Sequence, residues 1–101
     1  MDGAPEVTGN RVLGLDVGER RIGVSLSDAL RITAQPLTTI TRGVPGTDLK
    51  TIGGLVTTHA VQAVVVGLPL TLRGTVGEQA QRVMAFVEQL RGALPCPVHV
   101  L

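Results

Sequence analysis

Aromatic side chains are almost absent from this chain of 101 residues, which contains one Phe, no Trp and no Tyr. Recognition of single-stranded nucleic acid by stacking bases on an aromatic platform is therefore almost excluded. The one cysteine, Cys96, cannot form an intrachain disulfide or supply a thiolate metal cluster. No apolar run reaches about 18 residues, the length that spans a bilayer, and residues 1–9 lack the pattern of a signal peptide. These absences predict a soluble, cytoplasmic protein that does not bind membranes.

Net charge is also small, because 9 Lys and Arg residues face 8 Asp and Glu residues and leave +1. A broadly basic surface for non-specific nucleic-acid binding is excluded, whereas a local basic patch is not. Every basic residue except Lys50 is arginine, the residue better suited to forked contacts with phosphate. The hydrophobic share of 44% is enough for one packed core.

Three extended segments are predicted after a flexible tail at residues 1–10. Residues 11–17 form an apolar strand, and residues 21–27 alternate apolar and polar side chains, which is typical of a strand. Residues 18–20 between them predict a tight hairpin connection. Residues 36–41 are rich in β-branched side chains and complete an antiparallel meander of three strands.

The pattern then changes to helix, strand, helix and strand. The first helix is predicted to begin with Thr47 or Asp48 as its N-cap, and the second with Thr75 in a capping box with Glu78. Between them, the continuous apolar run at 63–68 is typical of a strand that is buried on both faces.

The predicted fold is a mixed α/β domain over residues 11–101, in which the meander precedes an α-β-α-β unit. The strands at 11–17, 63–68 and 97–101 should run parallel, with their carboxyl ends at one edge of the sheet. Ligands bind at that edge in such folds.

Asp16 is the residue of interest at this edge, because an unpaired carboxylate is costly to bury in an apolar strand. One interpretation is a buried acid that pairs with Arg20 or Arg21, or that accepts N–H groups of the turn. The alternative is a metal or phosphate role, which is favoured because Gly14 and Gly18 leave open space beside the carboxylate.

The loop at 67–75 leads from a buried strand to a helix N-terminus, a position that favours anions. Thr71 and Arg73 in this loop are suited to hydrogen bonds with phosphate. Together with Arg20 and Arg21, Arg73 would form a small basic rim around Asp16. A plain strand-to-helix turn with a solvated arginine is the alternative.

Other polar residues carry weaker signals. Asp28 lies too far along its strand to share a metal with Asp16, and we expect it to cap the loop that follows. Glu19 in the hairpin should point to solvent. His59 and Cys96 lack the neighbours that a metal site or a reactive thiol needs.

Several motifs in order resemble the YqgF/RuvX family, RNase H-like proteins described as pre-16S rRNA nucleases or Holliday junction resolvases. The resemblance covers about residues 11–101. The matching segments are Leu15-Asp16-Val17-Gly18, Arg21-Ile22-Gly23-Val24-Ser25, Ser27-Asp28, Ala34-Gln35-Pro36-Leu37, Val66-Gly67-Leu68-Pro69, Gly74-Thr75 and Gln79-Ala80.

The resemblance implies an RNase H-like fold and a nuclease that hydrolyses phosphodiesters in structured RNA or branched DNA with Mg²⁺ or Mn²⁺. Asp16 matches the catalytic and metal-binding acid of the family's first strand. Thr71, Arg73 and Gly74 match its second motif and would contact the substrate, with Arg20 and Arg21 beside them. Processing of pre-16S rRNA in ribosome biogenesis is the implied role, with Holliday junction resolution as the other.

The chain departs from the family pattern, which has further acids after the strand that ends here at Leu101 and near a final helix. We therefore expect an incomplete domain with little or no activity of its own. An uncovered sheet face or edge would then favour a homodimer. Two alternatives stay open: a non-catalytic module that binds RNA backbone, and a nucleotide-binding lobe of the actin-like ATPase class, which opens with a similar hairpin.

Overall fold

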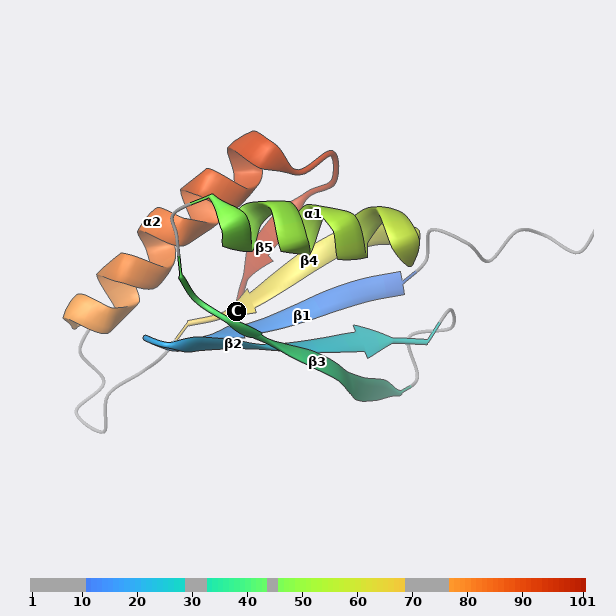
Figure 1. The fold of residues 1–101 in the computed structure, drawn as a ribbon, viewed down its shortest axis with the longest axis horizontal. Coiled ribbons are helices and arrows are strands. Elements are labelled where there is room, and N and C mark those ends of the chain that lie inside the picture. Colours follow the sequence, from blue (N-terminus) through green and yellow to red (C-terminus); the bar gives the residue numbers. More distant parts are fainter. Residues whose placement is uncertain (1–10, 29–32, 44–45, 69–76) are drawn as a thin grey trace, which may run out of the picture.

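Two helices lie against one face of a five-stranded sheet in the computed structural model, which describes residues 11–28, 33–43, 46–68 and 77–101 (Figure 1). The tail predicted at 1–10 lies outside the described residues. No helix in the described ranges has the length and apolar character needed to cross a bilayer. The elements follow in the order β1 (Arg11–Val17), β2 (Arg21–Ser27), β3 (Ala34–Thr41), α1 (Thr47–Thr58), β4 (Val61–Gly67), α2 (Glu78–Ala93) and β5 (Val98–Val100).

The strands lie in the order β3-β2-β1-β4-β5. The pairs β1–β2 and β2–β3 are antiparallel, whereas β1–β4 and β4–β5 are parallel. The predicted meander and the predicted parallel strands are both confirmed. The carboxyl ends of β1, β4 and β5 therefore meet at one edge of the sheet.

The core is formed between the helices and every second residue of the central strands. In β1, Leu13, Leu15 and Val17 are at most 4% exposed, and they pair with Leu26, Val24 and Ile22 of β2. The helices contribute a stripe of apolar residues at helical spacing. These are Ile52 and Val56 of α1, and Val83, Phe86, Val87 and Leu90 of α2.

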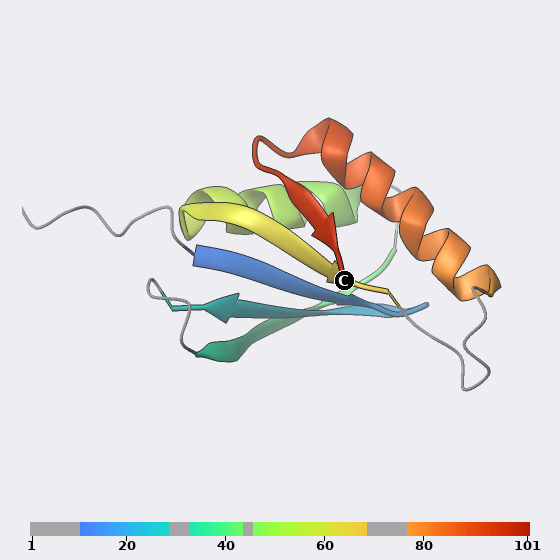
Figure 2. The same cartoon turned by 180° about the vertical axis from the view of Figure 1, so that it is seen from behind.

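The opposite face of the sheet carries none of the described helices (Figure 2). The expectation that the strand at 63–68 is buried on both faces is wrong for the described part of the chain. In β4, Val64 and Val66 point into the core and are fully buried, whereas Val65 is half-buried and Gly67 is exposed. The reason is that both described helices cover the same side. We refer to the other side as the open face.

Both helices begin with a glycine N-cap, which corrects the predicted helix starts. The N-cap of α1 is Gly46, at φ +92°, a conformation that glycine adopts without strain, and its carbonyl accepts the N–H of Lys50 at 3.1 Å. The N-cap of α2 is Gly77, whose carbonyl accepts the N–H of Gln81 at 3.1 Å. Thr47 and Asp48 lie within α1 and are not its N-cap, whereas Thr75 lies outside the described residues.

Candidate functional site

Asp16 lies on the open face, one residue before the carboxyl end of β1, and it is exposed. The interpretation of Asp16 as a buried acid is therefore wrong. Strand pleating explains the difference: Leu15 and Val17 point into the core, so the side chain between them must point the other way. Within the described residues, the Asp16 carboxylate has no hydrogen-bond or ion-pair partner.

Glycines flank Asp16 in both neighbouring strands. Asp16 pairs with Gly23 of β2 on one side and with Gly67 of β4 on the other. A Cβ at Gly23 would lie 3.7 Å from the Cβ of Asp16, in ordinary van der Waals contact. The open space that the sequence predicted beside the carboxylate is thus made chiefly by these two glycines. The two-residue turn at Glu19 and Arg20 sets Gly18 opposite Arg21 and so places Gly23 opposite Asp16. The three-residue connection predicted at 18–20 would instead place Ile22 there.

Small side chains continue this gap along β1. Gly14 pairs with Ser25, and a Cβ at Gly14 would lie only 2.7 Å from the Ser25 hydroxyl oxygen. The result is an open concavity of about 550 Å³ with Asp16 in its lining. Its other lining residues are Gly14, Leu15, Gly23, Val24, Ser25, Ala34, Pro36, Thr38, Thr39, Val65, Gly67 and Leu101.

Among the residues that the structure describes, Arg21 is an arginine that lies on the open face together with Asp16. Ile22 is fully buried on the helix side, so Arg21 and Gly23 on either side of it lie on the open face. Arg21 is a diagonal neighbour of Asp16 across the β1–β2 pair, a spacing of about 7–8 Å that is within reach of a long side chain, although the two form no ion pair. Arg20 lies in the exposed turn. The predicted contacts Thr71, Arg73 and Gly74 lie outside the described residues.

A second, larger concavity of about 860 Å³ is lined by residues of the hairpin, α1 and α2. Its acids are already engaged with arginines. Asp48 Oδ2 lies 3.5 Å from Arg42 Nε, and Glu19 Oε1 lies 3.7 Å from Arg82 Nη1. The exposed Asp16, which has no such pairing, makes the first concavity the better candidate for a site.

The described residues do not form a metal centre. No group of three or more His, Cys, Asp and Glu side chains in the described ranges could hold a metal ion. Asp28 lies at the far end of β2, where its carboxylate oxygens lie 3.3 and 3.5 Å from Thr33 donors, which confirms it as a loop cap. The Glu19 side chain is 71% exposed, as predicted. Asp16 thus supplies a single carboxylate, whereas a two-metal site needs several.

Cys96 fits the prediction of an unreactive thiol. Burial raises the pKa of its thiol, so a smaller fraction is present as the nucleophilic thiolate near neutral pH.

Sequence comparison identifies relatives over nearly the whole chain. A family model described as RuvX, Holliday junction resolvase, matches residues 10–101. A protein of Roseiflexus sp. that is 55% identical over 89 residues carries the name pre-16S rRNA nuclease, as does one of Chloroflexus aggregans at 51%. The matches cover 87% and 88% of this chain, but only 62% and 63% of those proteins. The chain thus spans about three fifths of the length of these relatives.

Comparison of structures shows the fold. RuvC of T. thermophilus, solved in complex with a Holliday junction substrate, gives a TM-score of 0.63 at 16% sequence identity, over 90% of this chain and 63% of that chain. YeaZ from Pseudomonas aeruginosa gives a TM-score of 0.50 at 20% identity, over 91% of this chain and 42% of that chain. The RNase H-like, mixed α/β fold implied by the resemblance is confirmed.

Proposed function

The chain belongs to the RuvX family of Holliday junction resolvases, and from that premise we propose that it carries Asp16 as the catalytic carboxylate of a nuclease. The reaction is hydrolysis of a phosphodiester bond in structured nucleic acid. One observation carries the proposal: Asp16 is exposed, has no partner in the described chain, and is flanked by Gly23 and Gly67 in an open concavity.

The glycines give the proposal its steric basis. A phosphodiester must approach the carboxylate closely, and any larger side chain at Gly23 or Gly67 would stand beside Asp16 on the same face. The position also fits the fold, because ligands of α/β sheets bind outside the carboxyl ends of the parallel strands. Asp16, Gly67 and Leu101 all lie at that edge.

Binding of a phosphodiester beside Asp16 requires a nearby cation, because the negative carboxylate and the negative phosphodiester repel each other. Arg21 supplies a positive charge on the same face, and Arg20 a second in the adjoining turn. In this proposal both arginines contact substrate phosphates, as do Thr71, Arg73 and Gly74 of the loop before α2.

The family resemblance implies Mg²⁺ or Mn²⁺ at Asp16. The described residues offer that ion one carboxylate and no cluster of acids, so no chemical step is assigned to it. The function of the described residues is therefore to bind and orient the nucleic acid beside Asp16.

Precursor rRNA is the substrate that the relatives' names favour, since they are called pre-16S rRNA nucleases. Branched DNA is the other candidate, because RuvC was solved with a Holliday junction. The one aromatic residue, Phe86, is 5% exposed, so base stacking on it is excluded. Recognition should then rest on backbone and shape. The cytoplasmic location stays a prediction.

The test compares cleavage of a precursor-rRNA fragment and of a four-way DNA junction by the wild type, Asp16→Asn and Glu19→Gln. Each variant loses one negative charge near the same hairpin, so a general charge effect would change both alike. We expect cleavage by the wild-type chain to be weak, Asp16→Asn to abolish it, and Glu19→Gln to leave it within about twofold, as for a surface substitution. Equal cleavage by Asp16→Asn and the wild type would contradict the proposal.

A non-catalytic module that holds nucleic-acid backbone is the second candidate. It is favoured by the absence of an acidic cluster from the described residues. Gel-shift binding of either substrate, without cleavage in Mg²⁺ or Mn²⁺, would support this candidate over the nuclease.

A further inference from the structure

Arg42, the first residue after β3, contacts the hairpin between β1 and β2 twice. Its backbone N–H donates to the carbonyl of Arg20 at 2.8 Å, and its side-chain Nη1 donates to the carbonyl of Gly18 at 2.9 Å. Within the hairpin, the N–H of Gly18 donates to the carbonyl of Arg21 at 2.8 Å. Two hairpin carbonyls therefore accept hydrogen bonds from the one residue that follows β3.

The guanidinium of Arg42 is in turn held by both helices. Its Nε lies 3.5 Å from Asp48 Oδ2 in the first turn of α1, and its Cζ lies 5.1 Å from the ring centre of Phe86 in α2. The Asp48 side chain is 10% exposed, so this ion pair is screened by water less than a surface pair. Its other oxygen, Oδ1, is buried with no hydrogen-bond partner among the described residues. Arg42 therefore ties the hairpin to α1 and α2.

We propose that Arg42 is a positioning residue, which holds the hairpin so that Asp16 and Arg21 keep their relative placement on the open face. Gly18 follows Asp16 by two residues, and Arg21 begins β2, so a shift of the hairpin changes the separation of the carboxylate and the cation. This inference rests on the proposed function of Asp16. Arginine is required because lysine lacks the planar fork that contacts Gly18, Asp48 and Phe86 at once.

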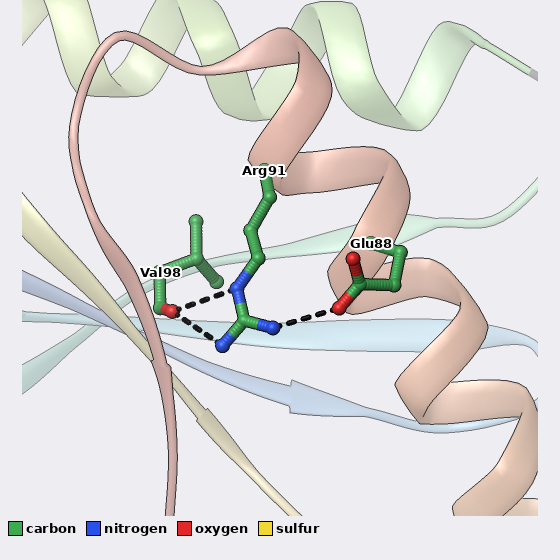
Figure 3. A network of polar contacts seen from close by, with 3 residues as sticks. All are labelled: Glu88, Arg91 and Val98. Carbon is green, nitrogen blue, oxygen red and sulfur yellow. Dashed lines mark hydrogen bonds and ion pairs between the residues drawn. The ribbon is translucent and has the colours of Figure 1, made fainter.

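Arg91 in the last turn of α2 provides a matched control, and Figure 3 shows its contacts. Its Nε and Nη2 donate to the carbonyl of Val98 at 3.2 and 3.0 Å, and its Nη1 lies 2.7 Å from Glu88 Oε2. Arg91 thus also joins a helix to the start of a strand and to a carboxylate, but away from Asp16. If losing such an arginine only lowers the stability of the fold, substitutions of Arg42 and of Arg91 should have the same effect.

The first measurement is amide hydrogen exchange by NMR in Arg42→Ala, Arg42→Lys and Arg91→Ala. We expect the Gly18 amide to exchange about tenfold faster in both Arg42 variants, the factor set by loss of one charge-assisted hydrogen bond. In Arg91→Ala the exchange at Gly18 should match the wild type, after correction for global stability. Unchanged exchange in Arg42→Ala, or full rescue by Arg42→Lys, would overturn the proposal.

The second measurement is cleavage kinetics with the same variants. We expect kcat to fall about tenfold in Arg42→Ala with little change in KM, because a transition-state contact is misplaced while backbone binding persists. Arg91→Ala should retain both constants. If the wild type does not cleave either substrate, the proposed nuclease function is contradicted. The positioning of the hairpin by Arg42 is then decided by the hydrogen exchange at Gly18. Wild-type kinetics in Arg42→Ala would contradict the positioning alone.

Discussion

At the scale of single residues, the room around Asp16 depends on the missing side chain of Gly23. A Cβ there would meet the Asp16 Cβ at 3.7 Å, so alanine is accommodated without a clash. We expect Gly23→Ala to keep or slightly raise stability, because glycine weakens a strand. Gly23→Leu should weaken nucleic-acid binding about tenfold or more, since the added atoms fill the space beside the carboxylate.

Binding of both variants is measured by fluorescence anisotropy, with stability followed by thermal unfolding. Gly92→Leu is the control, because Gly92 in α2 is exposed and has open space where a Cβ would be. Equal binding by Gly23→Leu and Gly92→Leu would show that the concavity beside Asp16 is not where the substrate lies.

The sequence places Asp16 at the correct edge of the sheet but not on the correct side of it. The antiparallel meander and the direction of the parallel strands follow from local patterns and short connections, and these bring the carboxyl ends of β1 and β4 to one edge. Whether a strand is covered on one face or both depends on where the helices pack, which a run of apolar residues such as 63–68 does not specify. Gly23 and Gly67 are recognised as neighbours of Asp16 only once the register is known.

At the scale of elements, the hairpin between β1 and β2 depends on close approach at Gly18. A Cβ at Gly18 would lie 3.0 Å from the backbone carbonyl oxygen of Arg21, which cannot move without opening the turn. We expect Gly18→Ala to lower the free energy of unfolding by about 1–3 kcal/mol through this overpacking. Gly43→Ala, at an exposed position where nothing lies within 4 Å of the added Cβ, should have little effect in the same urea titration. Equal stability of the two variants would contradict this account of the turn.

Helix α1 forms despite two glycines in its interior. Gly54 has open space where a Cβ would be, and a Cβ at Gly53 would lie 3.8 Å from a Leu94 methyl carbon, in ordinary contact. Replacing either glycine by alanine removes the entropic cost of ordering glycine in a helix. We expect the double alanine variant to be about 1–2 kcal/mol more stable in denaturant titrations. A loss of stability would mean that the added methyl group at position 53 crowds Leu94.

The first residues of the helices are the feature that the sequence predicts least well. Thr47, Asp48 and Thr75 have side chains that cap helices well, yet the glycines at 46 and 77 are the N-caps. Tertiary contact explains Asp48, which is buried against Arg42 instead of capping. Arg42 precedes Asp48 by only six residues, but their pairing depends on how α1 packs beside the hairpin that Arg42 also contacts, and no local pattern specifies that packing.

At the scale of the whole molecule, the open face carries mainly small side chains around Asp16, among them Gly14, Gly23, Ser25 and Gly67. Among the described residues, Leu101 is the one large hydrophobic residue that is exposed, at 84%. The expected homodimer through the sheet edge or open face stays a prediction. Sedimentation at rising protein concentration checks it, and a monomer throughout would contradict it.

The number of arginines that contact phosphates, and not the net charge of +1, sets how strongly the chain's affinity for nucleic acid depends on salt. Each phosphate that a cation neutralises contributes about −0.9 to the slope of log K against log salt on duplex DNA. If Arg20, Arg21 and Arg73 are the contacts, the slope expected for a four-way junction is about −2.7, and Arg21→Gln should reduce its magnitude by about 0.9. Arg91→Gln, which removes the same charge away from Asp16, should leave the slope unchanged. A wild-type slope steeper than about −5 would require more phosphate contacts than these arginines provide and would place the binding surface elsewhere.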